Sequence, residues 1–153
     1  SAKILSYRLV RKYEGSSPLQ RFKSERLIEV VRLRLANDTP LLLEKTFLSV
    51  DLCPDLSWER LENNALYSIL SEHYGLKPRR AVETYEAIIM TEEESKLLDC
   101  DKGLPAFLLK RSTWDQNEVM IEYTTSIMPS TRSMFEINMY EDNVKISRKS
   151  TMH

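Results

Sequence analysis

Glycine and histidine are scarce in this sequence, and their scarcity excludes several kinds of site. Only three glycines occur among 153 residues, too few to form a glycine-rich loop that holds the phosphates of a nucleotide. The two histidines, His73 and His153, offer no zinc cluster and argue against a Ser-His-Asp triad. We therefore expect neither a metal site nor a cofactor.

Cysteine, long apolar runs and net charge are limited as well. Cys53 and Cys100 match no metal or redox spacing, so we expect reduced thiols in a cytoplasmic protein. We find no run of about 18 apolar residues and no signal peptide, and expect no membrane contact. The net charge of −1 lacks the basic excess of a protein that binds DNA by itself.

What is present suits one domain with a core. The chain is 42% hydrophobic and 29% charged, as in an ordinary globular protein. Alternating apolar residues predict strands at residues 4–13, 27–36, 41–50, 80–90, 106–114, 119–128 and 134–140. The pattern also predicts a helix from an N-cap at Ser57 to about Tyr74, and a short helix that begins with a Thr91–Glu94 capping box. We expect an α+β fold with an antiparallel sheet, and a polar tail over residues 141–153.

The most distinctive segment is a predicted hairpin with two arginines on one strand. Asn37-Asp38-Thr39-Pro40 has the composition of a turn. Arg32 and Arg34 stand at alternate positions, so both side chains leave the same strand face. A pair of guanidinium groups binds phosphate or carboxylate well. Glu44 follows on the partner strand.

The same residues also allow a purely structural interpretation. Arg32 and Arg34 would then lie on a solvated outer face, in surface salt bridges of about 0–1 kcal/mol each. Glu44 would pair with one of them across the hairpin. Both roles are compatible, because a carboxylate that orients arginines also shapes a binding site.

Further short segments follow in a definite order. After the hairpin and Glu44 they are Leu66-Tyr67, Tyr74-Gly75-Leu76, Glu86-Ala87, Leu97-Leu98, Leu108-Leu109-Lys110-Arg111, Glu122-Tyr123, Arg132 and Phe135. This series covers roughly residues 4–140. It resembles the UTRA domain, the effector-binding domain of the HutC subfamily of GntR-type bacterial transcription regulators.

The resemblance implies a chorismate-lyase-like fold over residues 1–140, a six-stranded antiparallel sheet with flanking helices and a ligand pocket. It implies a homodimer that binds a small, anionic effector, such as a sugar phosphate, and regulates transcription as a repressor. It also implies that DNA is held only by an N-terminal winged helix-turn-helix domain outside this chain. The chain begins with Ser1 rather than Met, which agrees with a piece of a longer protein.

The resemblance further implies a ligand site made of Arg32, Arg34, Glu44, Tyr67, Glu86, Arg111, Glu122 and Arg132. Glu86 and Arg111 share largely apolar strand faces, so each either lines a pocket or pairs with an opposite charge. Ala65 stands where the family has a serine. The segment over residues 129–135 keeps Arg132 but lacks the family's Gly, Asp and Tyr, so we expect a different effector from the amino-sugar phosphates of some relatives.

Two other functions remain open at this point. Chorismate lyase shares the fold and also holds carboxylates with arginines, so an enzyme of that kind is one alternative. A domain that only dimerises, with a degenerate pocket, is the other. We expect a binding domain and not an enzyme.

Overall fold

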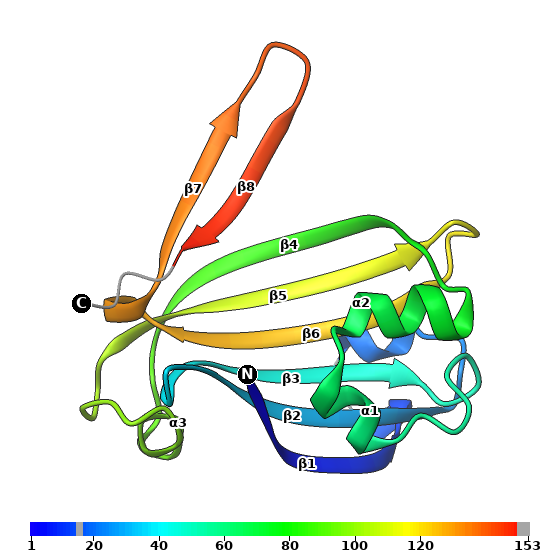
Figure 1. The fold of residues 1–153 in the computed structure, drawn as a ribbon, viewed down its shortest axis with the longest axis horizontal. Coiled ribbons are helices and arrows are strands. Elements are labelled where there is room, and N and C mark those ends of the chain that lie inside the picture. The colour runs from blue at the N-terminus through cyan, green and yellow to red at the C-terminus, as the bar shows by residue number, and fades with distance from the viewer. Residues whose placement is uncertain (15–16, 150–153) are drawn as a thin grey trace.

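Six strands form one sheet in the order β1-β2-β3-β6-β5-β4 in the computed structural model, which describes residues 1–14 and 17–149 (Figure 1). Every neighbouring pair of strands is antiparallel. The α+β class and the six-stranded antiparallel sheet are therefore confirmed. The strands are β1 (Ala2–Arg11), β2 (Arg26–Ala36), β3 (Thr39–Ser49), β4 (Pro78–Ile89), β5 (Pro105–Asp115) and β6 (Met120–Pro129).

The β2–β3 turn forms as its composition predicts. Asn37 and Asp38 adopt φ angles of 48° and 64°, and both values lie in the left-handed region that Asn and Asp tolerate best after glycine. A two-residue turn with positive φ at both positions matches the right-handed twist of the flanking strands. The resulting register sets Arg32 directly opposite Glu44.

The predicted helix from Ser57 to Tyr74 is wrong in one respect, because it is broken. Ser57 does cap α1 (Trp58–Asn63) by accepting a hydrogen bond from the Arg60 N–H. Asn64 is then extended (φ −137°, ψ 152°), and α2 (Leu66–Ser68) continues directly into η3 (Ile69–His73). The side-chain amides of Asn63 and Asn64 donate to carbonyls four residues earlier in α1, so they satisfy groups that further helix would have used.

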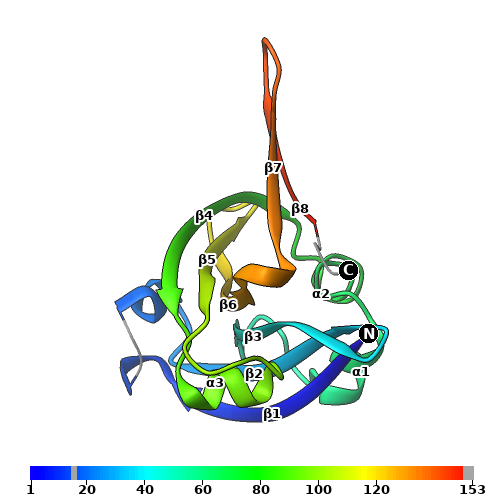
Figure 2. The same cartoon turned by 90° about the vertical axis from the view of Figure 1, so that its left-hand side faces the viewer.

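Opposite faces of the sheet carry different covers. Directly paired residues lie on one side of a sheet, and the pairing places four charged residues on the same side: Arg32, Glu44, Arg111 and Glu122. We call this side the front face. The α1–η3 segment packs on one end of the front face. The back face is covered by η2 (Ser17–Arg21) at one end and by α3 (Glu92–Leu97) at the other. Figure 2 shows α1 and α2 on one side of the sheet and the blue segment around residues 17–21 on the other.

The capping box that begins α3 is confirmed. Thr91 Oγ1 accepts from the Glu94 N–H at 3.1 Å, and the Glu94 carboxylate accepts from the Thr91 N–H at 2.9 Å. Two further single turns, η1 (Lys12–Glu14) and η4 (Ser130–Arg132), connect strands.

A second, two-stranded sheet projects from the main one. It consists of β7 (Met134–Met139) and β8 (Val144–Lys149), and it stands away from the six-stranded sheet in both views (Figures 1 and 2). Its base is attached to the front face, where Phe135 packs edge-to-face on Tyr85 and Phe107. The sequence predicted a polar tail from residue 141 onward, and so it missed β8. The last part of that predicted tail, residues 150–153, lies outside the described residues.

A candidate anion-binding site on the front face

A cavity of about 420 Å³ lies on the front face between the two covers, the α1–η3 segment and the base of the β7–β8 hairpin. Its lining includes four arginines and two glutamates: Arg32, Arg34, Arg111, Arg148, Glu44 and Glu62. Asn63, Asn64, Ala65 and Tyr67 close it from the helical side. The excess of cationic side chains suits a ligand with negative charge.

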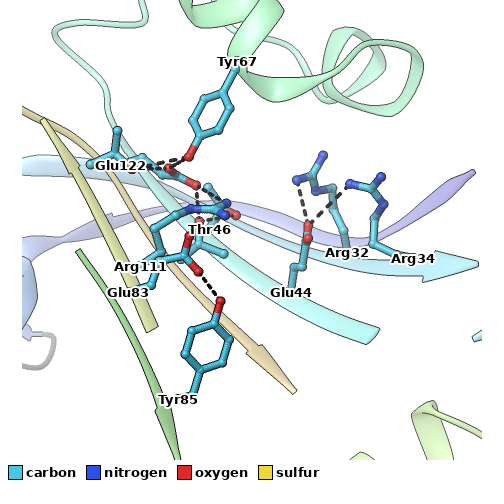
Figure 3. A network of polar contacts seen from close by, with 11 residues as sticks. Arg32, Arg34, Glu44, Thr46, Tyr67, Glu83, Tyr85, Arg111 and Glu122 are labelled. Atoms are coloured by element: carbon cyan, nitrogen blue, oxygen red, sulfur yellow. Dashed lines mark hydrogen bonds and ion pairs between the residues drawn. The ribbon is translucent and has the colours of Figure 1, made fainter. Parts of the chain in front are cut away.

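One glutamate oxygen holds the paired arginines of β2 (Figure 3). Glu44 Oε2 accepts from Arg32 Nη2 at 2.8 Å and lies 3.9 Å from Arg34 Nη1. The Arg32 side chain is 7% exposed, whereas that of Arg34 is 46% exposed. Arg32 is therefore fixed in the floor of the cavity, and Arg34 remains reachable from solvent.

The Arg32 guanidinium and the Glu44 carboxylate both keep hydrogen-bonding capacity for a ligand. Arg32 Nε is buried without a hydrogen-bond partner, and among the described residues the Arg32 side chain donates to Glu44 alone. Glu44 Oε1 accepts no hydrogen bond from any described residue. The predicted ion pair across the hairpin is thus confirmed, and it leaves room for the second role.

Glu122 lies beneath the cavity rather than in its lining. Its side chain is fully buried. Its Oε1 accepts from Tyr67 Oη and Thr113 Oγ1, each at 2.8 Å. Its Oε2 accepts from Thr124 Oγ1 at 2.6 Å and Arg111 Nη2 at 3.1 Å. Four donors saturate a carboxylate, so Glu122 orients the groups around it and has little capacity left for a further donor.

This carboxylate sets the properties of Arg111 and Tyr67. Burial lowers the pKa of the Arg111 guanidinium, but the charge of Glu122 and the nearby Tyr67 outweigh burial, so that pKa is raised overall. Burial and then the charge of Glu122 raise the pKa of Tyr67 to about 12. The Arg111 guanidinium also lies over the Tyr67 ring, 5.5 Å from its centroid. Arg111 stays cationic and Tyr67 stays a neutral hydrogen-bond donor at any physiological pH.

Two site features escaped the sequence analysis. Arg148 reaches the cavity from β8, and its Nη1 lies 3.3 Å from Met128 Sδ. Tyr85 Oη donates to Glu83 at 2.7 Å beside Arg111 (Figure 3). The alternation of Val144, Ile146 and Arg148 was the available signal for a strand that carries Arg148.

Two predicted site residues lie elsewhere. Glu86 is on the back face, 54% exposed, in an ion pair with Lys110 at 3.4 Å, because its strand position points away from Arg111. Arg132 donates to the backbone carbonyls of Pro40, Leu98 and Asp99 at 2.6–2.8 Å. It ties the end of α3 to the start of β3 and does not line the cavity.

The described residues contain no group of three or more His, Cys, Asp or Glu side chains placed to hold a metal ion. Within residues 1–14 and 17–149, no helix has the length and apolar character needed to cross a membrane.

Comparison with known proteins identifies relatives of one kind. The UTRA domain family model matches residues 1–133. The HTH-type transcriptional repressor NagR of Bacillus subtilis is 29% identical over 107 residues, which are 70% of this chain and 44% of that protein. The HTH-type transcriptional repressor PhnF of Mycolicibacterium smegmatis is 28% identical over 120 residues, 78% of this chain and 49% of PhnF. The chain thus spans about half the length of these relatives.

Solved structures agree on the fold. A GntR-family transcriptional regulator from Enterococcus faecalis superposes with a TM-score of 0.78 at 19% identity. The alignment covers 92% of this chain and 100% of that one.

Proposed function

The chain belongs to the UTRA domain family, and from that premise we propose that it is the effector-binding and dimerisation domain of a bacterial transcription repressor. The effector is a small anionic metabolite, such as a sugar phosphate, bound in the front cavity. One observation carries this proposal: among the residues that the structure describes, Arg32, Arg34, Arg111 and Arg148 line a single cavity together with two glutamates.

The contacts of the cavity suggest how a ligand would be held. Arg34 is the most available hydrogen-bond donor for an anionic ligand, since its side chain is 46% exposed and its contact with Glu44 is long, at 3.9 Å. Arg32 supplies a fixed charge beneath it. Glu44 Oε1 would accept from a hydroxyl or amino group of the ligand, which a sugar phosphate also carries.

The position of the cavity suggests how binding would be transmitted. Tyr67 from α2 and Arg148 from β8 line the same space, so one ligand would contact both the helical cover and the hairpin. A ligand changes the balance between two arrangements only if it binds them unequally. This chain spans about half the length of its relatives, which leaves room in them for an additional winged helix-turn-helix domain. Such a domain would change its affinity for DNA when the arrangement of this chain changes.

The β7–β8 hairpin supports the homodimer. Ile137, Met139, Val144 and Ile146 share one face of it and are 55–78% exposed. A two-stranded hairpin is marginally stable by itself, so this apolar face needs a cover, which a second copy of the chain supplies.

Sedimentation velocity tests the dimer. Ile146→Thr removes apolar area from this face and should raise the dimer dissociation constant at least about tenfold, the effect of 1.4 kcal/mol. Lys145→Thr is the control on the opposite face of the same strand. Equal dimerisation by both variants would remove the hairpin from the interface.

A binding role is favoured over a catalytic one because NagR and PhnF are transcriptional repressors by name. The chorismate-lyase alternative is tested directly: the purified chain should leave chorismate unconverted under conditions in which a chorismate lyase consumes it. Steady turnover would replace the proposal with an enzyme.

Thermal unfolding against a panel of sugar phosphates, phosphonates, amino-acid derivatives and neutral sugars tests the effector class. A ligand at 100 times its dissociation constant adds about 2.7 kcal/mol to stability, which raises Tm by about 2–4 °C per kcal/mol. A selective rise with an anionic compound supports the proposal. A rise with a neutral sugar alone would refute the anionic effector.

A further inference from the structure

The back face of the sheet carries a second cavity, of about 530 Å³, between the η2 cover and the middle of the sheet. Its walls include the aromatic rings of Phe47 and Tyr123, whose centroids lie 6.3 Å apart. Both residues are more than nine-tenths buried, at 8% and 5% exposure. Val10, Pro18 and Leu19 complete an apolar wall.

Cations outnumber anions around these rings. Arg8, Arg11, Lys45 and Lys110 line the cavity, and Glu29 is the one carboxylate among the described lining residues. Arg8 is committed to Glu29, with Nε at 2.8 Å from Oε1. Lys110 also contacts Glu86 at 3.4 Å, but that ion pair is exposed and therefore weak. Lys45 and Lys110 are the cations that we expect a ligand to meet.

Two of the cavity's polar groups lack an ionic or hydrogen-bonded partner. Lys45 forms no ion pair with any side chain that the structure describes. Tyr123 Oη makes no hydrogen bond to a described residue, and it is reachable by solvent although the rest of the residue is buried. A hydroxyl can donate one hydrogen bond, so that of Tyr123 is available to an acceptor in the cavity.

We propose that the back cavity is a second binding site, which takes a small molecule with a flat apolar body and one anionic group, such as an aromatic carboxylate or sulfonate. The flat body packs on Phe47 and Tyr123. The anion lies between Lys45 and Lys110 and accepts a hydrogen bond from Tyr123 Oη. Aromatic walls stabilise a bound flat ligand through burial and ring contacts. Hydrogen bonds from charged donors are stronger than those from neutral donors.

The sheet separates this site from the one on the front face. Lys45 follows Glu44 on β3, and Lys110 precedes Arg111 on β5, so each lysine points to the opposite side from its neighbour. Replacing both lysines therefore leaves the lining of the front cavity unchanged. The two sites, and the two proposals, can fail independently.

The test uses 8-anilinonaphthalene-1-sulfonate, a flat aromatic sulfonate, and its uncharged analogue N-phenyl-1-naphthylamine. Titrations of the whole chain are followed by probe fluorescence. The Lys45→Gln/Lys110→Gln variant should bind the sulfonate at least about tenfold more weakly than the parent, the equivalent of 1.4 kcal/mol. The control Lys3→Gln/Lys77→Gln, which removes the same charge elsewhere, should bind it as the parent does.

Two more comparisons locate the probe. Tyr123→Phe keeps the ring and removes only the hydroxyl, and should weaken sulfonate binding severalfold without changing the far-ultraviolet circular dichroism. Arg34→Ala, in the front cavity, should leave sulfonate binding within about twofold.

The outcomes that overturn the proposal are equally specific. Unchanged affinity in the double lysine variant would exclude the back cavity as the sulfonate site. A large loss in Arg34→Ala would assign the probe to the front cavity. Binding of the neutral analogue as tightly as the sulfonate would reduce the site to an apolar patch.

Discussion

Replacement of Glu122 by glutamine should strongly destabilise the protein. The side chain is fully buried and accepts from four donors, including Arg111. Glutamine loses the charge and turns an N–H₂ group toward donors that need an acceptor. Removing one member of a buried ion pair costs about 3–5 kcal/mol. We expect the lower end, about 3 kcal/mol, because Arg111 is 26% exposed and solvent can stabilise it.

Urea denaturation followed by circular dichroism measures this cost. The matched control is Glu136→Gln, which removes a carboxylate 42% exposed and 2.6 Å from Lys149, and should cost about 0–1 kcal/mol. In the double variant Glu122→Gln/Arg111→Met the unpaired charge is gone, so part of the lost stability should return. A loss below about 1 kcal/mol for Glu122→Gln would refute the reasoning, since it would mean that Glu122 does not organise the site.

Two other predictions concern pH and helix capping. Since burial and the charge of Glu122 raise the pKa of Tyr67 from 10.0 to about 12, the native state holds this proton longer than the unfolded state. The stabilising contribution of the protonated Tyr67 is full below pH 10 and is lost as pH rises toward 12. Urea titrations across this range should show a smaller decline in the free energy of unfolding for Tyr67→Phe than for the parent. An equal decline would contradict the assignment. Thr91→Ala breaks the capping box of α3 and should cost about 1 kcal/mol, seen as a Tm lower by about 2–4 °C; an unchanged Tm would show that the cap does not stabilise α3.

The strands and the paired arginines were predictable because they depend on local signals. Alternation gives strands wherever one face is buried, and Asn37-Asp38 specifies a turn by its own conformational preference. Alternation also placed Arg32 and Arg34 on one face correctly.

What could not be predicted depends on contacts between distant segments. The alternation of residues predicts which side chains share a strand face with Glu86. It does not predict which face of the sheet carries the cavity. Arg132 binds carbonyls more than 30 residues away in sequence, and no local pattern contains them. The β8 strand left only a weak signal in the sequence, the alternation of Val144 and Ile146, because pairing with β7 rather than burial defines it.

The central claim is that the front cavity binds an anionic effector through the arginines of β2. Isothermal titration calorimetry of the best anionic compound from the thermal panel tests it, with Arg34→Ala and the exposed-arginine control Arg79→Ala. Because a hydrogen bond to a charged group contributes about 1.5–3 kcal/mol, Arg34→Ala should raise Kd by about tenfold to a hundredfold, while Arg79→Ala binds as the parent does. Equal affinity of Arg34→Ala and the parent would contradict the account.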